Sequence, residues 1–194
     1  MISFSPLGED FYNRPVQQVA RELLGCRLVR RLDGSLLAGE IIETEAYDGE
    51  QDLACHARAG RTARTAVMYG PPGRAYVYFT YGMHWCLNAV CGSEGYPAAV
   101  LIRALRPVMG QEIIAARRAG VRPRDWLSGP ARLTRAWGVD GKLNGASLLA
   151  PTELWIESRE FPPIGGILCG PRIGIPNVPE PWRSQPWRYW LSQD

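Results

Sequence analysis

Residues 26–47, CRLVRRLDGSLLAGEIIETEAY, decide the fold, because they consist of two apolar runs separated by Asp33-Gly34. That dipeptide readily takes the positive φ angles of a two-residue hairpin turn. Runs rich in Leu, Val and Ile on both sides of such a turn are typical of paired antiparallel strands. The sequence therefore predicts a β-hairpin whose second strand is long.

The second strand of this hairpin carries two acidic residues among apolar ones. If the strand stays extended, Ile41, Glu43, Glu45 and Tyr47 share one face, with next-but-one side chains roughly 7 Å apart. A buried carboxylate costs free energy unless it is paired, hydrogen-bonded or used in chemistry. Arg103, which interrupts a later apolar run, is a candidate partner. The alternative is that both acids lie on a solvated face or simply pair with arginines.

The other patterns predict an α+β domain rich in antiparallel strands. Residues 15–25 have apolar side chains at the spacing of an amphipathic helix. Residues 75–92 are aromatic and β-branched enough for a second hairpin, with its turn near 80–83. We expect a single domain over residues 1–194. The remaining expected elements are an interior strand at 98–105, short helices at 109–120 and 129–138 that end at glycines, and short strands at 171–175 and 187–191.

The net charge of +3 hides an unusual choice of basic residue. Arginine supplies 21 of the 22 basic residues, and Lys142 is the only lysine. The planar guanidinium fits phosphate, so an arginine-rich face would bind nucleic acid, although codon usage in a GC-rich genome would give the same bias. Lys142 lies in the turn-like DGKLNG, which disfavours covalent Schiff-base chemistry.

Several classes of protein are disfavoured by composition. The chain does not open on a basic segment followed by an apolar core, and no run reaches the ~18 apolar residues that a membrane helix needs. The five cysteines are odd in number and form no C-x-x-C pair, which disfavours a disulfide framework and a zinc or iron–sulfur site. We therefore expect an intracellular protein with no membrane segment, metal or cofactor.

Aromatic residues gather near the acids in the sequence. Flat rings around a carboxylate suit a flat ligand, and stacking on a nucleobase contributes ~1–3 kcal/mol per base. Tyr81, beside a glycine at the predicted hairpin tip, has little core to enter, whereas Tyr76 and Trp85 are better explained as core aromatics. His56 is one of two histidines in the chain, and an isolated histidine is more often structural than functional. The full set comprises Tyr47, His56, Tyr76, Tyr78, Tyr81 and Trp85.

Basic residues supply candidate phosphate contacts. The irregular loop that follows the acids carries Arg58, Arg61 and Arg64. In SGPAR, Ser128 is a plausible N-cap, and Arg132 lies in the first turn of the helix that it would open. That pattern predicts either an anion site or simply a well-capped helix.

The motifs of the chain, taken in order, resemble the alkyladenine (3-methyladenine) DNA glycosylase family over nearly the whole sequence. They are ETEAY at 43–47, His56 nine residues after Tyr47, YVYFTYGMHWCLN at 76–88, LIRAL at 101–105, SGPARL at 128–133 and RIGI at 172–175.

The resemblance implies an enzyme that flips an alkylated or deaminated purine out of duplex DNA and hydrolyses its N-glycosidic bond. Such an enzyme is monofunctional, leaves an abasic site and initiates base excision repair. The fold implied has a curved antiparallel sheet, a protruding β-hairpin and flanking short helices. The expected partner is double-stranded DNA containing damaged purines, and we expect a monomer that works on the nucleoid in the cytoplasm.

The resemblance also implies a role for individual residues. Glu45 matches the general base that deprotonates water, and Arg103 matches its partner in holding that water. Asn88 matches the residue that screens out guanine by crowding its amino group, and Tyr81 matches the wedge that enters the minor groove. Glu43 matches no catalytic role. The residues that sandwich or hydrogen-bond the flipped base match Tyr47, His56 and Tyr78.

The sequence departs from the family pattern in the loop after the histidine. Ala57 stands where members often have serine, Thr65 where asparagine is common, and Tyr69 where phenylalanine is usual. These positions lie at the expected rim of the pocket. They therefore bear on substrate preference more than on the reaction.

Other functions fit parts of the sequence. A carbohydrate glycosidase would use Glu43 and Glu45 as paired acids, but neighbours on one strand face cannot easily flank a sugar. A non-catalytic single-strand binder would use the rings and arginines and would be indifferent to Glu45→Gln. A base deaminase is disfavoured, because the sequence lacks H-x-E with P-C-x-x-C.

Overall fold

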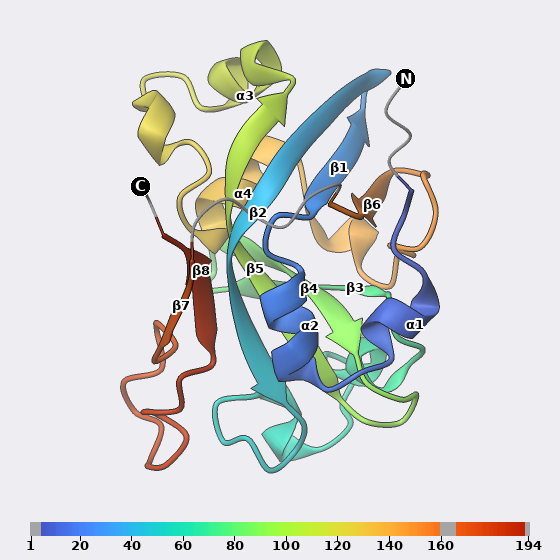
Figure 1. Ribbon diagram of the computed structural model, residues 1–194, viewed down its shortest axis with the longest axis vertical. Helices are drawn as coiled ribbons and strands as arrows, with labels where there is room; N and C mark the ends of the chain where they lie inside the picture. Colours follow the sequence, from blue (N-terminus) through green and yellow to red (C-terminus); the bar gives the residue numbers. More distant parts are fainter. Residues whose placement is uncertain (1–4, 160–165, 193–194) are drawn as a thin grey trace.

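The computed structural model describes residues 5–159 and 166–192, in which one antiparallel sheet organises the chain (Figure 1). The strands run in the order β3-β4-β5-β2-β1-β6, and β8 pairs with both β2 and β7. They are β1 (Arg27–Leu32), β2 (Ser35–Asp48), β3 (Ala75–Thr80), β4 (His84–Cys91), β5 (Ala98–Met109), β6 (Leu154–Glu157), β7 (Ile167–Gly170) and β8 (Arg188–Leu191). The α-helices are α1 (Glu9–Tyr12), α2 (Val16–Glu22), α3 (Gln111–Arg117) and α4 (Pro130–Trp137), and the 3-10 helices are η1 (His56–Ala59), η2 (Ala66–Tyr69), η3 (Pro123–Asp125) and η4 (Gly141–Leu143).

Both predicted hairpins are confirmed. β1 and β2 pair in antiparallel register up to the turn, where φ is +48° at Asp33 and +79° at Gly34. β3 and β4 pair in the same way, and their turn has φ of +52° at Tyr81 and +65° at Gly82. A positive φ is unfavourable for a side chain as large as tyrosine. The second turn therefore holds a large ring at the hairpin tip at some conformational cost.

The long strand β2 pairs with three other strands. β5 pairs along one edge of β2, while β1 and β8 pair with different halves of the other edge. Figure 1 shows β2 crossing the centre of the molecule, with α2 packed on it and the β7–β8 pair beside its second half. The result is the α+β domain with a curved antiparallel sheet that the sequence predicts.

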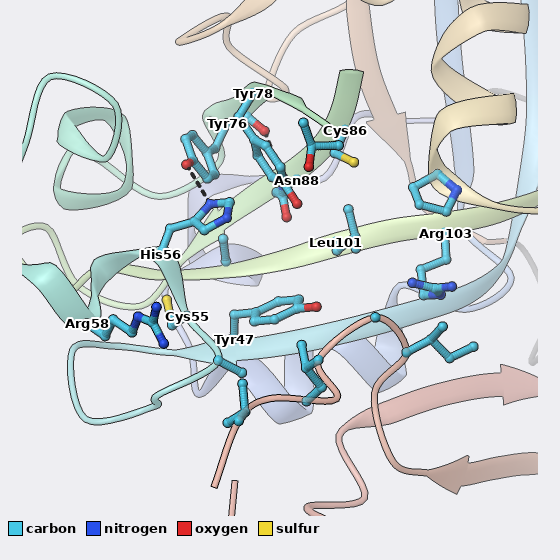
Figure 2. Close-up of a pocket in the computed structure, with 18 of the residues that line it drawn as sticks. Tyr47, Cys55, His56, Arg58, Tyr76, Tyr78, Cys86, Asn88, Leu101 and Arg103 are labelled. Carbon is cyan, nitrogen blue, oxygen red and sulfur yellow. Dashed lines mark hydrogen bonds between the residues drawn. The ribbon is translucent and has the colours of Figure 1, made fainter. Parts of the chain in front are cut away.

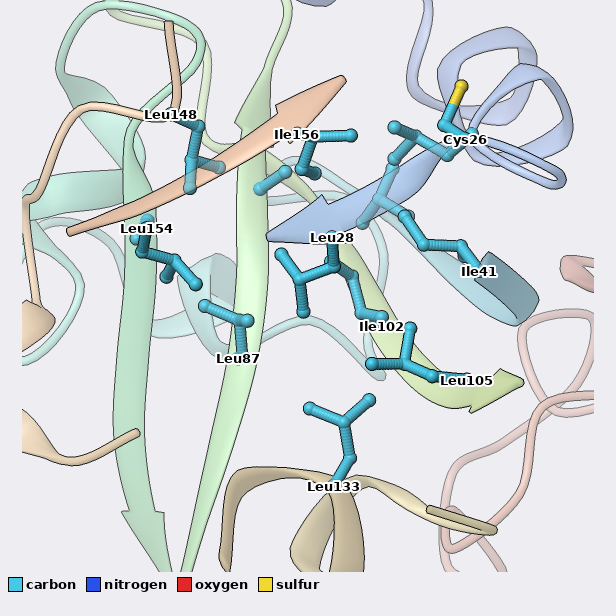
Figure 3. Packing of buried hydrophobic residues seen from close by; sticks show 14 of the residues in the cluster. Cys26, Leu28, Ile41, Leu87, Ile102, Leu105, Leu133, Leu148, Leu154 and Ile156 are labelled. Atoms are coloured by element: carbon cyan, nitrogen blue, oxygen red, sulfur yellow. The ribbon is translucent and has the colours of Figure 1, made fainter. Parts of the chain in front are cut away.

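One face of the sheet packs into the main hydrophobic core (Figure 3). Successive side chains of a strand point to opposite faces, so alternate residues of each central strand enter this core. α2 and α4 close it with their apolar faces, and burying each aliphatic side chain contributes roughly 1.5–3 kcal/mol. Its centre contains Leu28, Ile41, Leu87, Ile102, Leu133 and Ile156.

A bulge at Ile42 changes which residues of β2 share a face with the acids. Register shifts on either side of Glu43 leave Ile42 as an extra residue on β2 and Arg103 as one on β5. A bulge inverts the in–out alternation beyond it. Ile41 therefore turns into the main core, and the prediction that it shares a face with Glu43 and Glu45 is wrong.

Other sequence predictions need correction at short elements. Residues 171–175 form no strand, because that segment leaves the sheet immediately after β7. The helix expected to end at Gly120 ends at Arg117, whereas α4 ends at Gly138 as predicted. α1, β6 and β7 were not predicted, because four residues are too few to show a hydrophobic period.

Candidate functional site

The face of the sheet opposite the core forms one wall of a pocket of about 540 Å³ (Figure 2). Residues 53–58 and 173–178 close its other sides. The alternation that sends half of each strand into the core therefore sends the other half into the pocket. The strand residues that line it are Tyr47 of β2, Tyr76, Tyr78 and Thr80 of β3, Cys86 and Asn88 of β4, and Ala99, Leu101 and Arg103 of β5.

Glu45 is fully buried behind this wall, and its carboxylate is bonded to three residues that line the pocket. The Tyr47 hydroxyl donates to Oε2 at 2.9 Å, and Arg103 Nη1 lies 3.2 Å from the same oxygen. The backbone N–H of Ile173 donates to Oε1 at 2.7 Å. A carboxylate has about four lone-pair directions, so three donors leave room for one more.

The surroundings of Glu45 shift the pKa of its carboxyl group. Burial raises its pKa, because desolvation disfavours the charged form. Arg103 opposes that rise most strongly, followed by the Ile173 N–H and the Tyr47 hydroxyl. A buried carboxylate whose pKa is set by a specific cation beside a cleft is typical of a catalytic position.

Arg103 joins both acids of β2. Its Nε donates to Oε1 of Glu43 at 3.0 Å, and Arg188 Nη1 reaches the same oxygen at 3.2 Å. One guanidinium therefore bridges Glu43 and Glu45 on a single side of the pocket. A sugar hydrolase needs its two carboxyl groups on opposite sides of the bond, so this geometry disfavours a carbohydrate glycosidase.

Aromatic side chains lie on both sides of the pocket. Figure 2 shows Tyr47 along one side and His56, Tyr78 and Asn88 across from it. The His56 ring meets the Tyr78 ring edge to face, with centroids 4.4 Å apart. Such walls accept a flat unsaturated ligand, which gains stacking energy on both faces.

His56 is held in the neutral form. Its Nδ1 lies 2.9 Å from the Tyr76 hydroxyl, within hydrogen-bond distance. Burial, followed by the charges of Arg64 and Arg58, lowers the pKa of His56 to about 4. At neutral pH the imidazole therefore has one N–H to donate, rather than two.

Asn88 and Tyr81 both line the pocket, the first from inside the sheet and the second from the hairpin tip. Asn88 is buried, and its Nδ2 donates to the carbonyl oxygen of Tyr76 at 3.0 Å, which fixes the amide against β3. Tyr81 is 78% exposed at the hairpin tip, beside the mouth of the pocket. An aromatic ring held in water by a turn indicates a contact surface.

The three loop arginines lie around the rings. Arg58 lines the pocket, Arg61 lies 5.8 Å from the Tyr69 ring centroid, and Arg64 lies 5.1 Å from that of Tyr78. In Arg61 and Arg64 these distances are measured from Cζ, so each guanidinium lies over a ring in a cation–π contact. The loop therefore presents positive charge next to the pocket mouth.

Ser128 does not cap α4, so that prediction is wrong. The N-cap is Gly129, and no side chain bonds the first turn. Instead the Ser128 hydroxyl accepts a bond from Arg132 Nη1 at 2.8 Å, and the same nitrogen pairs with Asp125 at 3.0 Å. Because α4 begins at Pro130, Ser128 lies one position too early to cap it.

Sequence patterns missed the residues that approach the site from the C-terminal segment. Arg172 and Ile173 were assigned to a strand, yet they lie in an irregular segment that reaches Glu45 and the loop residue Asp52. Tyr76 is buried in a small apolar cluster, as predicted for a core aromatic, but its position in the pocket wall beside His56 was not predicted. The alternation of β3 was the signal that could have placed Tyr76.

Two kinds of feature were not found in the part of the chain that the structure describes. Within residues 5–159 and 166–192, no group of three His, Cys, Asp or Glu side chains is arranged to hold a metal ion. No helix in those ranges has the length and apolar character to cross a bilayer.

Comparison with known proteins gives one family. The family model described as "Methylpurine-DNA glycosylase (MPG)" matches residues 10–194. A relative from Carboxydothermus hydrogenoformans is 48% identical over 97% of this chain and 96% of its own length, and one from Methanocella arvoryzae is 48% identical over 95% and 91%. A relative from Streptomyces avermitilis is 43% identical over 98% and 89%. All three bear the name "Putative 3-methyladenine DNA glycosylase".

Proposed function

The chain belongs to the methylpurine-DNA glycosylase family, and from that premise we propose that it releases 3-methyladenine and related damaged purines from double-stranded DNA. The observation that carries the proposal is the buried Glu45–Arg103 ion pair behind a pocket walled by flat rings. A base and an aromatic slot are what hydrolysis of a nucleoside bond requires.

The damaged base would enter the pocket only after leaving the duplex. Extrusion costs a few kcal/mol, and the cost is smallest for lesions that pair poorly. Tyr81 would fill the vacated position in the stack from the minor groove, which offsets part of the lost stacking. The base would then lie between Tyr47 and the His56–Tyr78 pair, with Asn88 excluding the amino group of guanine.

Hydrolysis would use one water activated by Glu45. The water would occupy the remaining acceptor direction of the carboxylate, next to Arg103, and give its proton to Glu45 as its oxygen attacks the sugar carbon. The bond between that carbon and the base nitrogen breaks, and its electron pair leaves with the base. A cationic purine such as 3-methyladenine then departs neutral, without a proton from the enzyme.

Neutral lesions place a further demand on the pocket. Hypoxanthine or ethenoadenine leaves as an anion unless it is protonated or accepts a hydrogen bond. His56 is neutral and has one N–H, so it can donate to such a base but cannot act as a strong acid. We therefore expect cationic alkylated purines to be released faster than neutral ones.

The proposal is tested by single-turnover release from duplexes that each contain one 3-methyladenine, hypoxanthine or ethenoadenine. Free base in the supernatant is measured by chromatography, and abasic sites in the strand are counted after alkali. Release in the predicted order supports the proposal. Binding of all three duplexes with no free base would show that the fold serves another purpose.

Tyr81→Ala is expected to slow release from duplex DNA at least tenfold, because the vacated stack is no longer filled. Release from a single strand, where no stack needs filling, should change little. The ring is exposed, so the melting temperature should stay that of the wild type. Tyr81→Phe is the matched control and should behave as wild type. Equal losses on duplex and single strand would contradict a wedge role.

Contacts between arginines and DNA phosphates predict that the affinity for duplex DNA depends on the salt concentration. Log affinity for duplex should fall linearly with log salt, and each phosphate contact contributes roughly 0.9 to the slope. Arg61→Gln should reduce the slope by about that amount, whereas Arg132→Gln should reduce it less, because Asp125 already engages that guanidinium. Arg31→Gln on β1 is the control. A slope unchanged by Arg61→Gln would remove that residue from the DNA interface.

The reaction should stop at the abasic site. Lys142, the only lysine, is exposed on η4 and does not line the pocket, so its amine is not placed for a Schiff base. Borohydride added during turnover should therefore trap no protein–DNA adduct.

We propose that the enzyme acts as a monomer on the nucleoid in the cytoplasm, where its DNA substrate lies.

A further inference from the structure

A buried ion pair outside the pocket joins the two segments that close it. Arg172 and Asp52 are both fully buried as side chains, and Arg172 Nη2 donates to Asp52 Oδ1 at 2.9 Å while Nη1 contacts Oδ2. Neither residue lines the pocket. The function described above uses neither of them, so their place in the fold requires a separate explanation.

Each partner of this pair organises backbone near the site. Asp52 accepts bonds from the N–H groups of Asp48 and Ala54, which shapes the loop that leads to His56. Arg172 donates to the carbonyl oxygen of Ala46 at 2.9 Å and to that of Trp182 at 3.1 Å. The guanidinium thus ties the irregular C-terminal segment to β2.

The same guanidinium supports Tyr47 from behind. Its Cζ lies 4.8 Å from the Tyr47 ring centroid and 5.0 Å from that of Trp187. A guanidinium between two aromatic faces is held by cation–π attraction. The residue after Arg172 is Ile173, whose N–H donates to Glu45.

We infer that Arg172 and Asp52 are positioning residues, which hold the Ile173 N–H on the Glu45 carboxylate and fix the back of the Tyr47 ring. This inference rests on the proposed function for Glu45. A buried ion pair adds little net stability compared with apolar residues of the same size, but it can specify one arrangement of the chain. Here the specified arrangement places the Ile173 N–H on the Glu45 carboxylate.

Glu45 has several charged and titratable neighbours besides that donor. Glu43 and Tyr47 lie on β2, Arg103 on β5 and Cys86 on β4, while Arg188 of β8 bonds Glu43. Of these neighbours, only Tyr47 contacts the Arg172 guanidinium. A change in the titration of Glu45 therefore reports the two donors that the ion pair holds, the Ile173 N–H and the Tyr47 hydroxyl.

Arg172→Lys is the first test, because it keeps the charge but cannot bond Asp52 bidentately. A donor to the ionised form lowers the pKa of a carboxyl, so its loss raises that pKa. We expect the Glu45 titration, measured by ¹³C NMR of the carboxyl in the free protein, to move up by about one pH unit. The acidic limb of single-turnover release should move by the same amount.

A second variant tests the same inference if Arg172→Lys does not fold. Arg172→Met with Asp52→Leu removes both charges together, which such pairs often tolerate, and should raise the Glu45 titration in the same direction. Arg183→Gln, in an exposed pair with Glu180 on the same segment, is the control and should leave both readouts unchanged.

The two readouts separate the possible failures. If the wild type releases no base, the proposed function falls, yet the NMR titration still tests the positioning role. If either folded variant titrates at Glu45 as the wild type does, the positioning role is overturned even when catalysis is intact. A general loss of stability would lower the melting temperature without moving either pH midpoint.

Discussion

Glu45→Gln is expected to lower the single-turnover rate of base release by roughly 10²–10⁴-fold, the range for a positioned general base. Glutamine keeps the size of the side chain, and its oxygen can still accept the Ile173 N–H. It cannot take a proton from water. Rates are measured with enzyme in excess over a duplex carrying one 3-methyladenine.

The same substitution should not weaken the fold. Burial raises the pKa of Glu45 in the folded protein, so folding favours the protonated form. The penalty for the charged form is absent below the ordinary glutamate pKa of about 4.3 and grows as pH rises through the raised folded value. At neutral pH the variant loses that penalty and buried Arg103 keeps Glu43 as its partner, so Glu45→Gln should melt close to the wild-type temperature.

Glu43→Gln is the matched control for that experiment. Glu43 lies on the same strand face and shares Arg103, but it is half-buried and also bonds Arg188. Its loss should change the release rate by less than about tenfold. Equal losses in the two variants would contradict the assignment of the base to Glu45.

Arg103→Met is expected to have the largest effect on stability, a loss of roughly 3–5 kcal/mol at neutral pH, because it leaves a buried charge without its partner. Arg103 is buried and bridges both acids. Unfolding in urea at neutral pH measures the loss. At acid pH, where Glu45 is protonated, the loss should shrink.

A double variant distinguishes the buried charge from simple packing. Adding Glu45→Gln to Arg103→Met removes the unpaired carboxylate and should restore part of the stability, so the two effects should not add. Strict additivity, or a loss below about 1 kcal/mol for Arg103→Met alone, would show that Glu45 is already neutral beside Arg103.

Local patterns in the sequence predicted the parts of the fold that local chemistry controls. Asp33-Gly34 and Tyr81-Gly82 both form the predicted turns with positive φ. The alternation that follows these turns placed Glu45 and Tyr47 on one strand face. Arg103 stood out because it interrupts an apolar run, and the structure pairs it with both acids.

Features that depend on distant segments were not predictable in this way. The bulge at Ile42 follows from how β2 pairs with β5, and no local signal marks it. Ile173 reaches Glu45 across 128 residues of sequence, and Arg172 reaches Asp52 across 120. Ser128 was misplaced because a helix start uncertain by one residue decides whether a side chain can cap it.

The most direct test of the account follows one ethenoadenine in duplex DNA by stopped-flow fluorescence and by chemical quench. Wild type should show a fluorescence change as the base leaves the stack, followed by free base. Glu45→Gln should show the same first change and almost no free base. Release by Glu45→Gln at the wild-type rate, or free base without any preceding fluorescence change, would contradict a flipped base hydrolysed by Glu45.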